Sequence, residues 1–224
     1  MSCWIRKSFK LPFLLITCFL LICLGYKYRK HFEKIEALKR LTIPMDRRIN
    51  ILQVMTKDVL LLANQSNIPL MLMYGSLLGI IRENQLPLKH DFDVDLGIEE
   101  KHYNEFCTLV SKLRFPSKVY DYGPHKKIRI WDTETDLNID IFAIHTSKEG
   151  KSRRMVIPYL TSFFLNECSE WFDSSVFFPM QPIKVLEQTV FIPNQPEELL
   201  KCWYGSSWTI SDKFCELDGF CRRQ

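Results

Sequence analysis

The chain has 224 residues, 46% of them hydrophobic and 13% aromatic, which is enough to bury one substantial core and little more. Its net charge of +4 is uneven, because residues 1–48 hold 11 Lys/Arg against 3 Asp/Glu, whereas the remaining 176 residues hold 19 against 23. An acidic domain without a stripe of Lys and Arg is a poor nucleic-acid binder, since phosphate neutralisation supplies most of that affinity.

An apolar segment at residues 11–26 lies between basic flanks near the N-terminus. As a helix its sixteen uncharged residues would span roughly 24 Å, short of a hydrocarbon core of about 30 Å, although flanking aromatic and lysine side chains can extend it. We expect an uncleaved membrane anchor. A cleaved signal peptide is the alternative, but Cys23-Leu24-Gly25 is a poor Ala-x-Ala cleavage site. Both flanks are basic, so composition does not set the orientation.

The composition divides the chain into a terminal segment 1–10, the anchor 11–26, a basic stem 27–48 and a folded domain 49–224. The stem includes a short charged helix over residues 32–41. The domain holds the cysteines Cys107, Cys168, Cys202, Cys215 and Cys221, without zinc-ligand spacing. In an oxidising lumen one or two disulfides would form, most simply among the last three of these.

Hydrophobic periodicity and turn residues predict an alternation of helices and strands along the domain. Helices are expected at 46–63, 99–113 and 196–203, with a turn into a short helix at 75–81. Strands are expected at 69–74, from 91, at 118–122, 127–131 and 137–144, and loops at 85–90, 133–136 and 148–154. The late apolar segments through Ile192 are expected to mix strands and turns.

The strand expected from residue 91 carries the most informative pattern in the chain. Asp91, Asp93 and Asp95 alternate with apolar residues, so a strand would place the three carboxylates on one face. Carboxylates this close repel one another, and burial raises their pKa values unless a cation compensates them. Hard oxygen ligands suit Mg²⁺, Mn²⁺ or Ca²⁺ better than zinc.

Two simpler interpretations of the acidic run are less favoured. A solvated acidic turn would not interleave apolar residues. An EF-hand loop would need Gly at its sixth position and a bidentate Glu at its twelfth, where this chain has Leu96 and His102.

A further carboxylate, Asp140, lies in the middle of the apolar strand at 137–144. One interpretation is a structural ion pair with Arg129 or Lys127. The other places Asp140 beside Asp93 and Asp95 as the third ligand of a metal site that serves phosphoryl transfer. Both remain open at this stage.

A Gly-Ser turn, a pair of aspartates in an apolar strand and a later lone aspartate follow one another in an order that resembles the nucleotidyltransferase fold of the DNA polymerase beta superfamily. Within it the chain resembles the LicD/fukutin family, closest to the fukutin branch, over residues 68–208. The resemblance rests on residues 74–79 (Tyr-Gly-Ser-Leu-Leu-Gly) with Arg82, on 93–98 (Asp-Val-Asp-Leu-Gly-Ile), on 139–142 (Ile-Asp-Ile-Phe), on 191–193 (Phe-Ile-Pro) and on 204–208 (Tyr-Gly-Ser-Ser-Trp). It implies an α/β fold, a mixed sheet flanked by helices.

Two features depart from the family pattern. The bacterial sequences carry Pro-Trp and a middle Asp around the acidic cluster, where this chain has Lys89-His90 and Phe92. The 224-residue chain is also much shorter than fukutin, so the large N-terminal region of that protein is not expected here. The metal pair survives these changes, but the local ligand pocket is expected to differ.

The resemblance implies a metal-dependent transfer of a phospho-alcohol, such as phosphocholine or ribitol phosphate, from a CDP-activated donor to a glycan hydroxyl. Mg²⁺ or Mn²⁺ would lie on Asp93, Asp95 and Asp140, and Asp91 would orient or deprotonate the acceptor. Gly75, Ser76 and Arg82 would contact the donor phosphates, and together with Tyr74 they make up the expected substrate-binding set. As a helix residue Arg82 has a surface interpretation of equal weight, and Lys89 and His90 are weaker candidates.

The resemblance also implies a type II protein of the Golgi or endoplasmic reticulum membrane, with residues 1–10 cytosolic and the domain luminal. Asn64, in an Asn-x-Ser sequence, would then be open to glycosylation. The expected partners are the CDP-alcohol donor, the glycan acceptor, the membrane and other glycosyltransferases, without nucleic acid. The alternative function is a catalytically weak, membrane-anchored binding subunit of a glycosyltransferase assembly.

Overall fold

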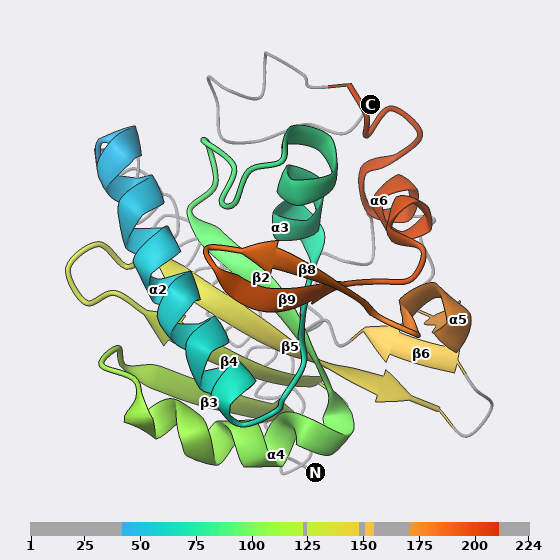
Figure 1. Ribbon diagram of the computed structural model, residues 1–224, viewed down its shortest axis with the longest axis horizontal. Helices are drawn as coiled ribbons and strands as arrows, with labels where there is room; N and C mark the ends of the chain where they lie inside the picture. The colour runs from blue at the N-terminus through green and yellow to red at the C-terminus, as the bar shows by residue number, and fades with distance from the viewer. Residues whose placement is uncertain (1–41, 123–124, 148–150, 155–170, 211–224) are drawn as a thin grey trace, which may run out of the picture. The chain divides into compact units, whose positions relative to one another are not determined.

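The structure is a computed structural model that describes residues 42–122, 125–147, 151–154 and 171–210 (Figure 1). The chain divides into two compact units, Met1–Ile43 and Pro44–Gln224, and the fold below is that of the second. The predicted anchor at 11–26 and stem helix at 32–41 lie outside the described residues. Among the helices that are described, none has both the length and the apolar character needed to cross a membrane.

A mixed sheet of nine strands forms the centre of the described domain, and its mixed character agrees with what the family resemblance implies. Its main path runs β3-β4-β5-β2-β1-β9-β8, and β6 and β7 continue from β5. The pairs β2/β5 and β1/β9 are parallel and the other pairs antiparallel. The strands are β1 Leu70–Leu72, β2 Asp93–Glu99, β3 Ser117–Tyr122, β4 His125–Trp131, β5 Asn138–Thr146, β6 Lys151–Arg154, β7 Trp171–Asp173, β8 Gln181–Val185 and β9 Gln188–Ile192.

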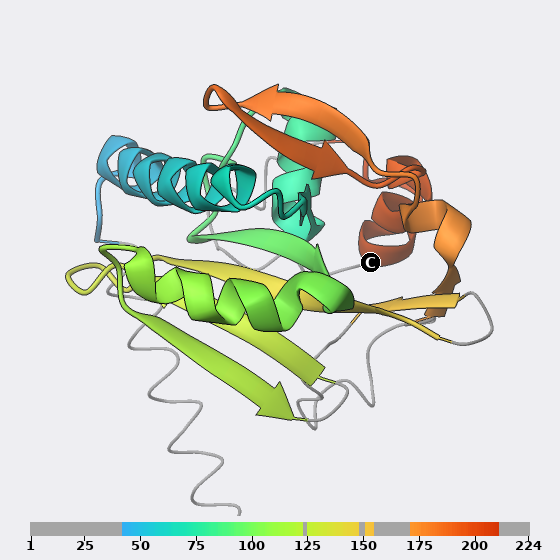
Figure 2. The ribbon, with the colours of Figure 1, turned by 60° about the horizontal axis from the view of Figure 1, so that its bottom comes forward.

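Two helices, α2 (Met45–Gln65) and α4 (Glu100–Leu109), pack against the central strands β2 and β5. In Figure 1, α2 runs across the sheet in front of β5, and Figure 2 shows α2 and α4 from a second side. The fully buried side chains of Val94, Leu96, Ile139 and Ile141 alternate with the aspartates along β2 and β5. The apolar residues therefore make one face of these strands, which leaves the opposite face for the carboxylates.

The helix predicted at 46–63 is confirmed by α2. Its buried side, Leu52, Met55, Val59 and Leu60, follows the spacing of an amphipathic helix. The helix predicted at 99–113 is α4, followed by a 3₁₀ turn at Val110–Lys112. The late helix is α6, Pro196–Tyr204, and a four-residue helix α5, Ser174–Phe177, precedes β8.

The connection from β1 to β2 positions the site. Strand β1 leads directly into α3, Tyr74–Leu78, and then into a π-helical turn, Gly79–Glu83. A Cβ at Gly79 would lie 2.5 Å from the carbonyl oxygen of Gln85, so only glycine allows the chain to fold back this closely. Residues 84–92 then return to the sheet as a loop.

Two expectations are corrected by the strand boundaries. Strand β2 begins at Asp93, so Asp91 lies in the preceding loop, where its N–H donates to the carbonyl oxygen of Leu88 at 3.0 Å and closes a turn. The basic loop expected at 148–154 contains strand β6, which pairs with β5 and β7.

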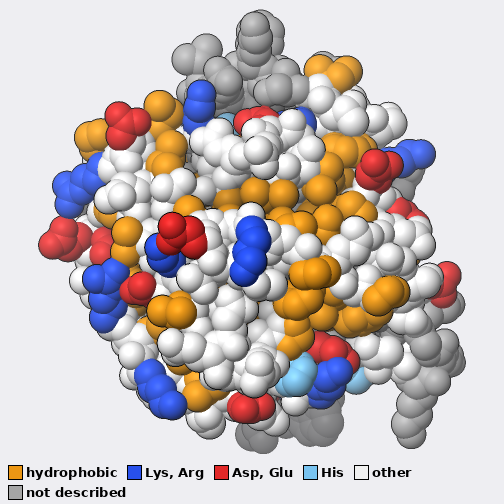
Figure 3. All heavy atoms as spheres, in the orientation of Figure 1, with side chains coloured by type: hydrophobic (Ala, Val, Ile, Leu, Met, Phe, Trp, Pro, Cys, Tyr) orange, Lys and Arg blue, Asp and Glu red, His pale blue; other side chains and the backbone are white. Residues whose placement is uncertain are grey.

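Hydrophobic side chains gather on the surface over the region of α3, β8 and α6 (Figure 3). On the same face, Lys and Arg side chains are interspersed with Asp and Glu. Of the domain cysteines that are described, Cys107 is free and Cys202 takes part in a disulfide, in keeping with the expectation for Cys202.

Candidate metal centre and active site

Three carboxylates meet where β2 and β5 run side by side. The parallel register places Asp95 opposite Asp140 and Asp93 opposite Asn138. Ligand oxygens of Asp93, Asp95 and Asp140 all lie within 4.8 Å of one another. The structure thus brings together residues that are separated by more than forty positions in the chain.

The surroundings of Asp95 raise the pKa of its carboxyl group. Burial raises the pKa of Asp95 well above its ordinary value, and the neighbouring carboxylates Asp93, Asp140 and Asp91 raise it further. Lys127 acts in the opposite direction. A cluster with this excess of negative charge favours a bound cation.

Asp140 is also half of a buried ion pair. Its two carboxylate oxygens accept hydrogen bonds from Nε and Nη2 of Arg129 at 2.8 and 2.7 Å, and Nζ of Lys127 donates to one of them at 3.1 Å. The Asp140 side chain is only 6% exposed. Both interpretations of Asp140 from the sequence are therefore compatible with the geometry.

The donor set suits a divalent metal ion that prefers oxygen ligands. All three groups are hard carboxylate oxygens, and their separation lets one ion reach each of them. Beside them, the amide nitrogen of Asn138 is buried without a hydrogen-bond partner among the described residues, so the site has a donor to spare for a ligand oxygen.

Asp91 lies next to the cluster although it is outside the strand. Burial, followed by repulsion from Asp93, raises its pKa to about 7. Its Oδ2 would lie 3.1 Å from a Cβ at Gly75, and its Oδ1 lies 4.0 Å from Nε2 of His90. Gly75 therefore makes the room that this carboxyl group occupies.

Ser76 connects α3 to β2, the strand that carries Asp93 and Asp95. Its side chain is buried, and its hydroxyl oxygen accepts a hydrogen bond from the N–H of Asp95 at 2.8 Å. The preceding Tyr74 has a left-handed backbone, φ 47°, and its ring packs on Phe142 and Trp203 with centroid distances of 5.6 and 4.4 Å.

Arg82 lies in the π-helical turn that follows α3. Its guanidinium donates to the Glu83 carboxylate at 2.6 and 3.0 Å and to the carbonyl oxygen of Trp208 at 3.3 Å. The hydrogen bond to Trp208 connects the late Tyr-Gly-Ser-Ser-Trp segment to the π-helical turn. Phosphate binding by Arg82 stays a prediction, as do the roles of the other sequence-predicted site residues.

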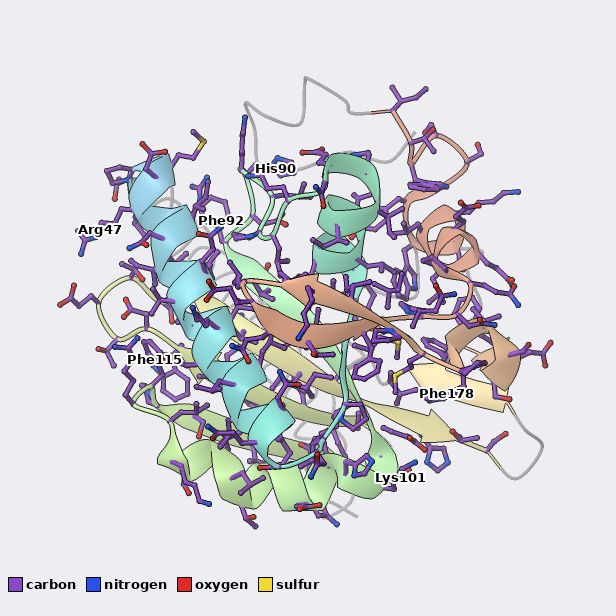
Figure 4. The ribbon with its side chains drawn as sticks, viewed as in Figure 1. Arg47, His90, Phe92, Lys101, Phe115 and Phe178 are labelled. Carbon is purple, nitrogen blue, oxygen red and sulfur yellow. The ribbon has the colours of Figure 1, made fainter. Side chains whose placement is uncertain are left out.

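Arg48 is a site residue that the sequence reasoning missed. It is 7% exposed, Nη2 donates to the carbonyl oxygen of Lys89, and its guanidinium lies 4.3 Å from the ring centroid of Phe92. Figure 4 shows Phe92 and His90 on the loop next to the first turns of α2. The signal was available, because Arg48 precedes Leu52 and Met55 by helical spacing on the apolar face.

The fold and the site together define a nucleotidyltransferase-type domain: a strand, a Gly-Ser turn into a short helix, two carboxylates on an adjacent strand and a third on the next. The family described as LicD/FKTN/FKRP, nucleotidyltransferase domain, matches residues 67–195. The chain belongs to this family, which confirms the resemblance seen in the sequence. The match does not distinguish the fukutin branch from the others.

The solved structures that are similar to this chain are distant from it in sequence. The crystal structure of ANT(2")-Ia in complex with adenylyl-2"-tobramycin is 12% identical, with a TM-score of 0.43 over 70% of this chain and 77% of that one. The lincomycin-bound lincosamide antibiotic adenylyltransferase LnuA is also 12% identical, with a TM-score of 0.42 over 69% and 85%. No curated protein sequence matches the chain.

Proposed function

We propose that the protein transfers a phospho-alcohol, of the ribitol phosphate or phosphocholine type, from a CDP-activated donor to a glycan hydroxyl in a metal-dependent reaction. The observation that carries the proposal is the convergence of Asp93, Asp95 and Asp140 on one face of the sheet. The family match supports a transferase with a nucleotidyltransferase domain. The donor alcohol and the acceptor glycan come from the sequence resemblance.

The three carboxylates would hold Mg²⁺ or Mn²⁺. A divalent ion in such a place neutralises phosphate oxygens and the charge that develops on the leaving group. The chain itself supplies positioning: Ser76 holds the backbone at Asp95, and Tyr74 is fixed by Phe142 and Trp203.

Asp91 is the proposed acceptor base. Its carboxyl group lies beside the cluster with a pKa of about 7, so near neutral pH it is divided between a form that accepts a proton and one that donates it. The Asp91 carboxylate would take the proton of the glycan hydroxyl as that oxygen attacks phosphorus. The CMP leaving group would depart from the opposite side.

We also propose that residues 11–26 anchor the protein in the Golgi or endoplasmic reticulum membrane, with the domain in the lumen. The support is the apolar segment itself and the family resemblance. Asn64, in the last turn of α2, is half-buried and its amide donates to Oε1 of Gln188 at 3.3 Å. Protection of the domain from protease in sealed microsomes, together with a glycosidase-sensitive mobility shift, is the expected result; digestion without a shift would overturn this topology.

A second candidate function follows from the ion pairs of Asp140. Because Arg129 and Lys127 already neutralise this carboxylate, the centre can persist without a metal. Such a domain would act as a binding subunit of a glycosyltransferase assembly, with weak or no catalysis.

Release of CMP separates the two functions. The full chain in detergent is incubated with a panel of CDP-alcohols and Mn²⁺, with and without glycan acceptors. We expect acceptor-dependent CMP release by the native protein and its loss in Asp93→Asn. The matched control is Asp136→Asn, the same chemical change at an exposed position whose φ of 59° suits asparagine. A folded protein that is silent across the panel would favour the binding subunit.

A further inference from the structure

We propose that Arg129 and Lys127 form an exchangeable cation pair: they hold Asp140 in the protein without metal, and they move to the diphosphate of the donor when metal and donor bind. The inference rests on the proposed function and adds a diphosphate-binding role for two residues of β4. Neither residue belongs to the motifs that identify the family in this sequence.

Strand register places both cations on the carboxylate face. Arg129 pairs with Asp140 across β4 and β5, and Lys127 pairs with Phe142, two positions further along the same strand. Side chains at alternate positions point to the same side of a sheet. Both cations therefore lie next to the face that carries Asp93 and Asp95.

The exposure of the three partners is graded. The side chain of Asp140 is 6% exposed, that of Lys127 12% and that of Arg129 35%. The carboxylate is thus buried behind a guanidinium that still reaches solvent. The pair with Asp140 occupies two of the five N–H donors of Arg129, and a planar guanidinium is suited to bidentate contacts with phosphate.

The other described arginines next to the site, Arg48 and Arg82, bind other partners. Arg48 is held by Phe92 and the carbonyl oxygen of Lys89, and Arg82 by Glu83 and Trp208. In the part of the chain that the structure describes, Arg129 and Lys127 are the cations whose nitrogens lie within 4 Å of the Asp140 carboxylate.

The charge balance makes the exchange favourable only when both ligands are present. A divalent ion that takes Asp140 as a ligand competes with Arg129, and the displaced cations then need a new anionic partner. A diphosphate is such a partner. Metal and diphosphate should therefore increase each other's affinity, and the coupling should pass through Arg129.

Binding of Mn²⁺ tests the inference without any turnover. Mn²⁺ affinity is measured for the full chain in detergent by electron paramagnetic resonance, with and without CDP as the diphosphate probe. We expect CDP to tighten Mn²⁺ binding by about tenfold in the native protein, in the usual range of such coupling. In Arg129→Gln, Mn²⁺ alone should bind more tightly than in the native protein, and the effect of CDP should fall to about twofold or less.

Matched variants keep the test decisive. Arg129→Lys retains the positive charge but not the planar, two-pronged guanidinium, so it should give intermediate coupling. Lys127→Gln should also reduce the coupling, and it serves as the test variant if Arg129→Gln does not fold. Arg47→Gln is the control, because Arg47 pairs on the surface with Glu134, with side chains 58% and 76% exposed. It should leave both affinities unchanged.

Unaltered Mn²⁺ affinity and CDP coupling in Arg129→Gln, or in both Arg129→Lys and Lys127→Gln, would overturn the exchange. A failure of the proposed function looks different. If no CDP-alcohol releases CMP but the Mn²⁺ and CDP coupling depends on Arg129, the exchange stands and the protein is a nucleotide-binding subunit.

Discussion

The hydroxyl oxygen of Ser76 accepts a hydrogen bond from the backbone N–H of Asp95 at 2.8 Å. This hydrogen bond joins the short helix after β1 to the strand that carries two of the three clustered carboxylates. The Gly-Ser turn therefore stabilises the position of β2, in addition to the phosphate contact proposed for it.

Ser76→Ala should lower both stability and activity. The N–H of Asp95 would lose its acceptor in a buried place, at a cost of about 1–3 kcal/mol in the free energy of unfolding. Denaturant unfolding and CMP release measure the two effects. Ser175→Ala, at an exposed position, is the control and should change neither. An unchanged unfolding midpoint in Ser76→Ala would show that the hydrogen bond is dispensable.

Asp93→Asn and Asp95→Asn should abolish transfer while the fold without metal stays intact or becomes slightly more stable. Each change removes a ligand and also relieves repulsion among carboxylates. We expect activity to fall by about 100-fold or more. Thermal melts should show that Mn²⁺ with donor raises the melting temperature of the native protein and not of the variants. Full activity in Asp93→Asn would contradict the catalytic interpretation.

Asp140→Asn should be distinguished from these two by its effect on stability. The change leaves Arg129 and Lys127 without their carboxylate partner in a largely buried place. Loss of one member of a buried pair costs about 3 kcal/mol or more, reduced here to roughly 2–3 because Arg129 is partly solvated. Unfolding by denaturant without metal measures it. A variant of Asp140 as stable as Asp93→Asn would show that the ion pair adds nothing to the fold.

The protein without metal should lose stability as the pH rises through about 7. Burial raises the pKa of Asp91 from 3.8 to about 7, so between these values the folded state keeps a proton that the unfolded chain has released. Stability therefore decreases with pH in this window, and the decrease levels off above the folded pKa. From pH 6 to pH 8 the share of Asp91 is about 1 kcal/mol.

Comparison of the native protein with Asp91→Asn isolates this share. Unfolding free energies are measured at pH 6 and pH 8 with chelator present. The variant should show the smaller difference between the two pH values; an equal difference would assign the titration to other groups, of which Asp95 is the first.

Arg48→Met should loosen the loop that carries Asp91. The variant removes the hydrogen bond to the Lys89 carbonyl oxygen and the stacking on Phe92, but keeps an apolar side chain on the buried face of α2. We expect faster amide hydrogen exchange in residues 85–92 and about a tenfold loss of CMP release. Arg48→Lys should recover part of both. Unchanged exchange in this loop would contradict the positioning role.

Patterns of regular period predicted most of the central fold. The amphipathic spacing of α2, the strand around Asp140 and the alternation at Asp93 and Asp95 depend on local sequence alone. Asp91 could not be placed by the same pattern, because the strand begins only after the turn closed by its N–H to Leu88. In the sequence, the alternation of aspartates with apolar residues continues back to Asp91, but this hydrogen bond keeps Asp91 in a turn and outside the strand.

The parts that the sequence left undetermined depend on contacts between distant segments. The register that sets Asp95 against Asp140 also sets Arg129 against Asp140, and neither can be read from one strand. The ion pair and the metal ligand are therefore alternatives in the sequence, whereas in the structure the carboxylate that forms the ion pairs also lies in the cluster with Asp93 and Asp95. Strand β6 was not predicted, because its basic residues show no strand pattern and form a strand through pairing with β5 and β7.

The parallel pairing of β2 with β5 also has a consequence for folding. A parallel neighbour requires the chain to cross over, and here the crossover contains α4 and the β3/β4 hairpin before Asp140 returns to meet Asp95. Such long-range pairing forms slowly compared with local contacts. The carboxylate cluster is therefore absent from any fragment that stops before β5. During refolding, the appearance of Mn²⁺ affinity should mark the moment at which this crossover closes.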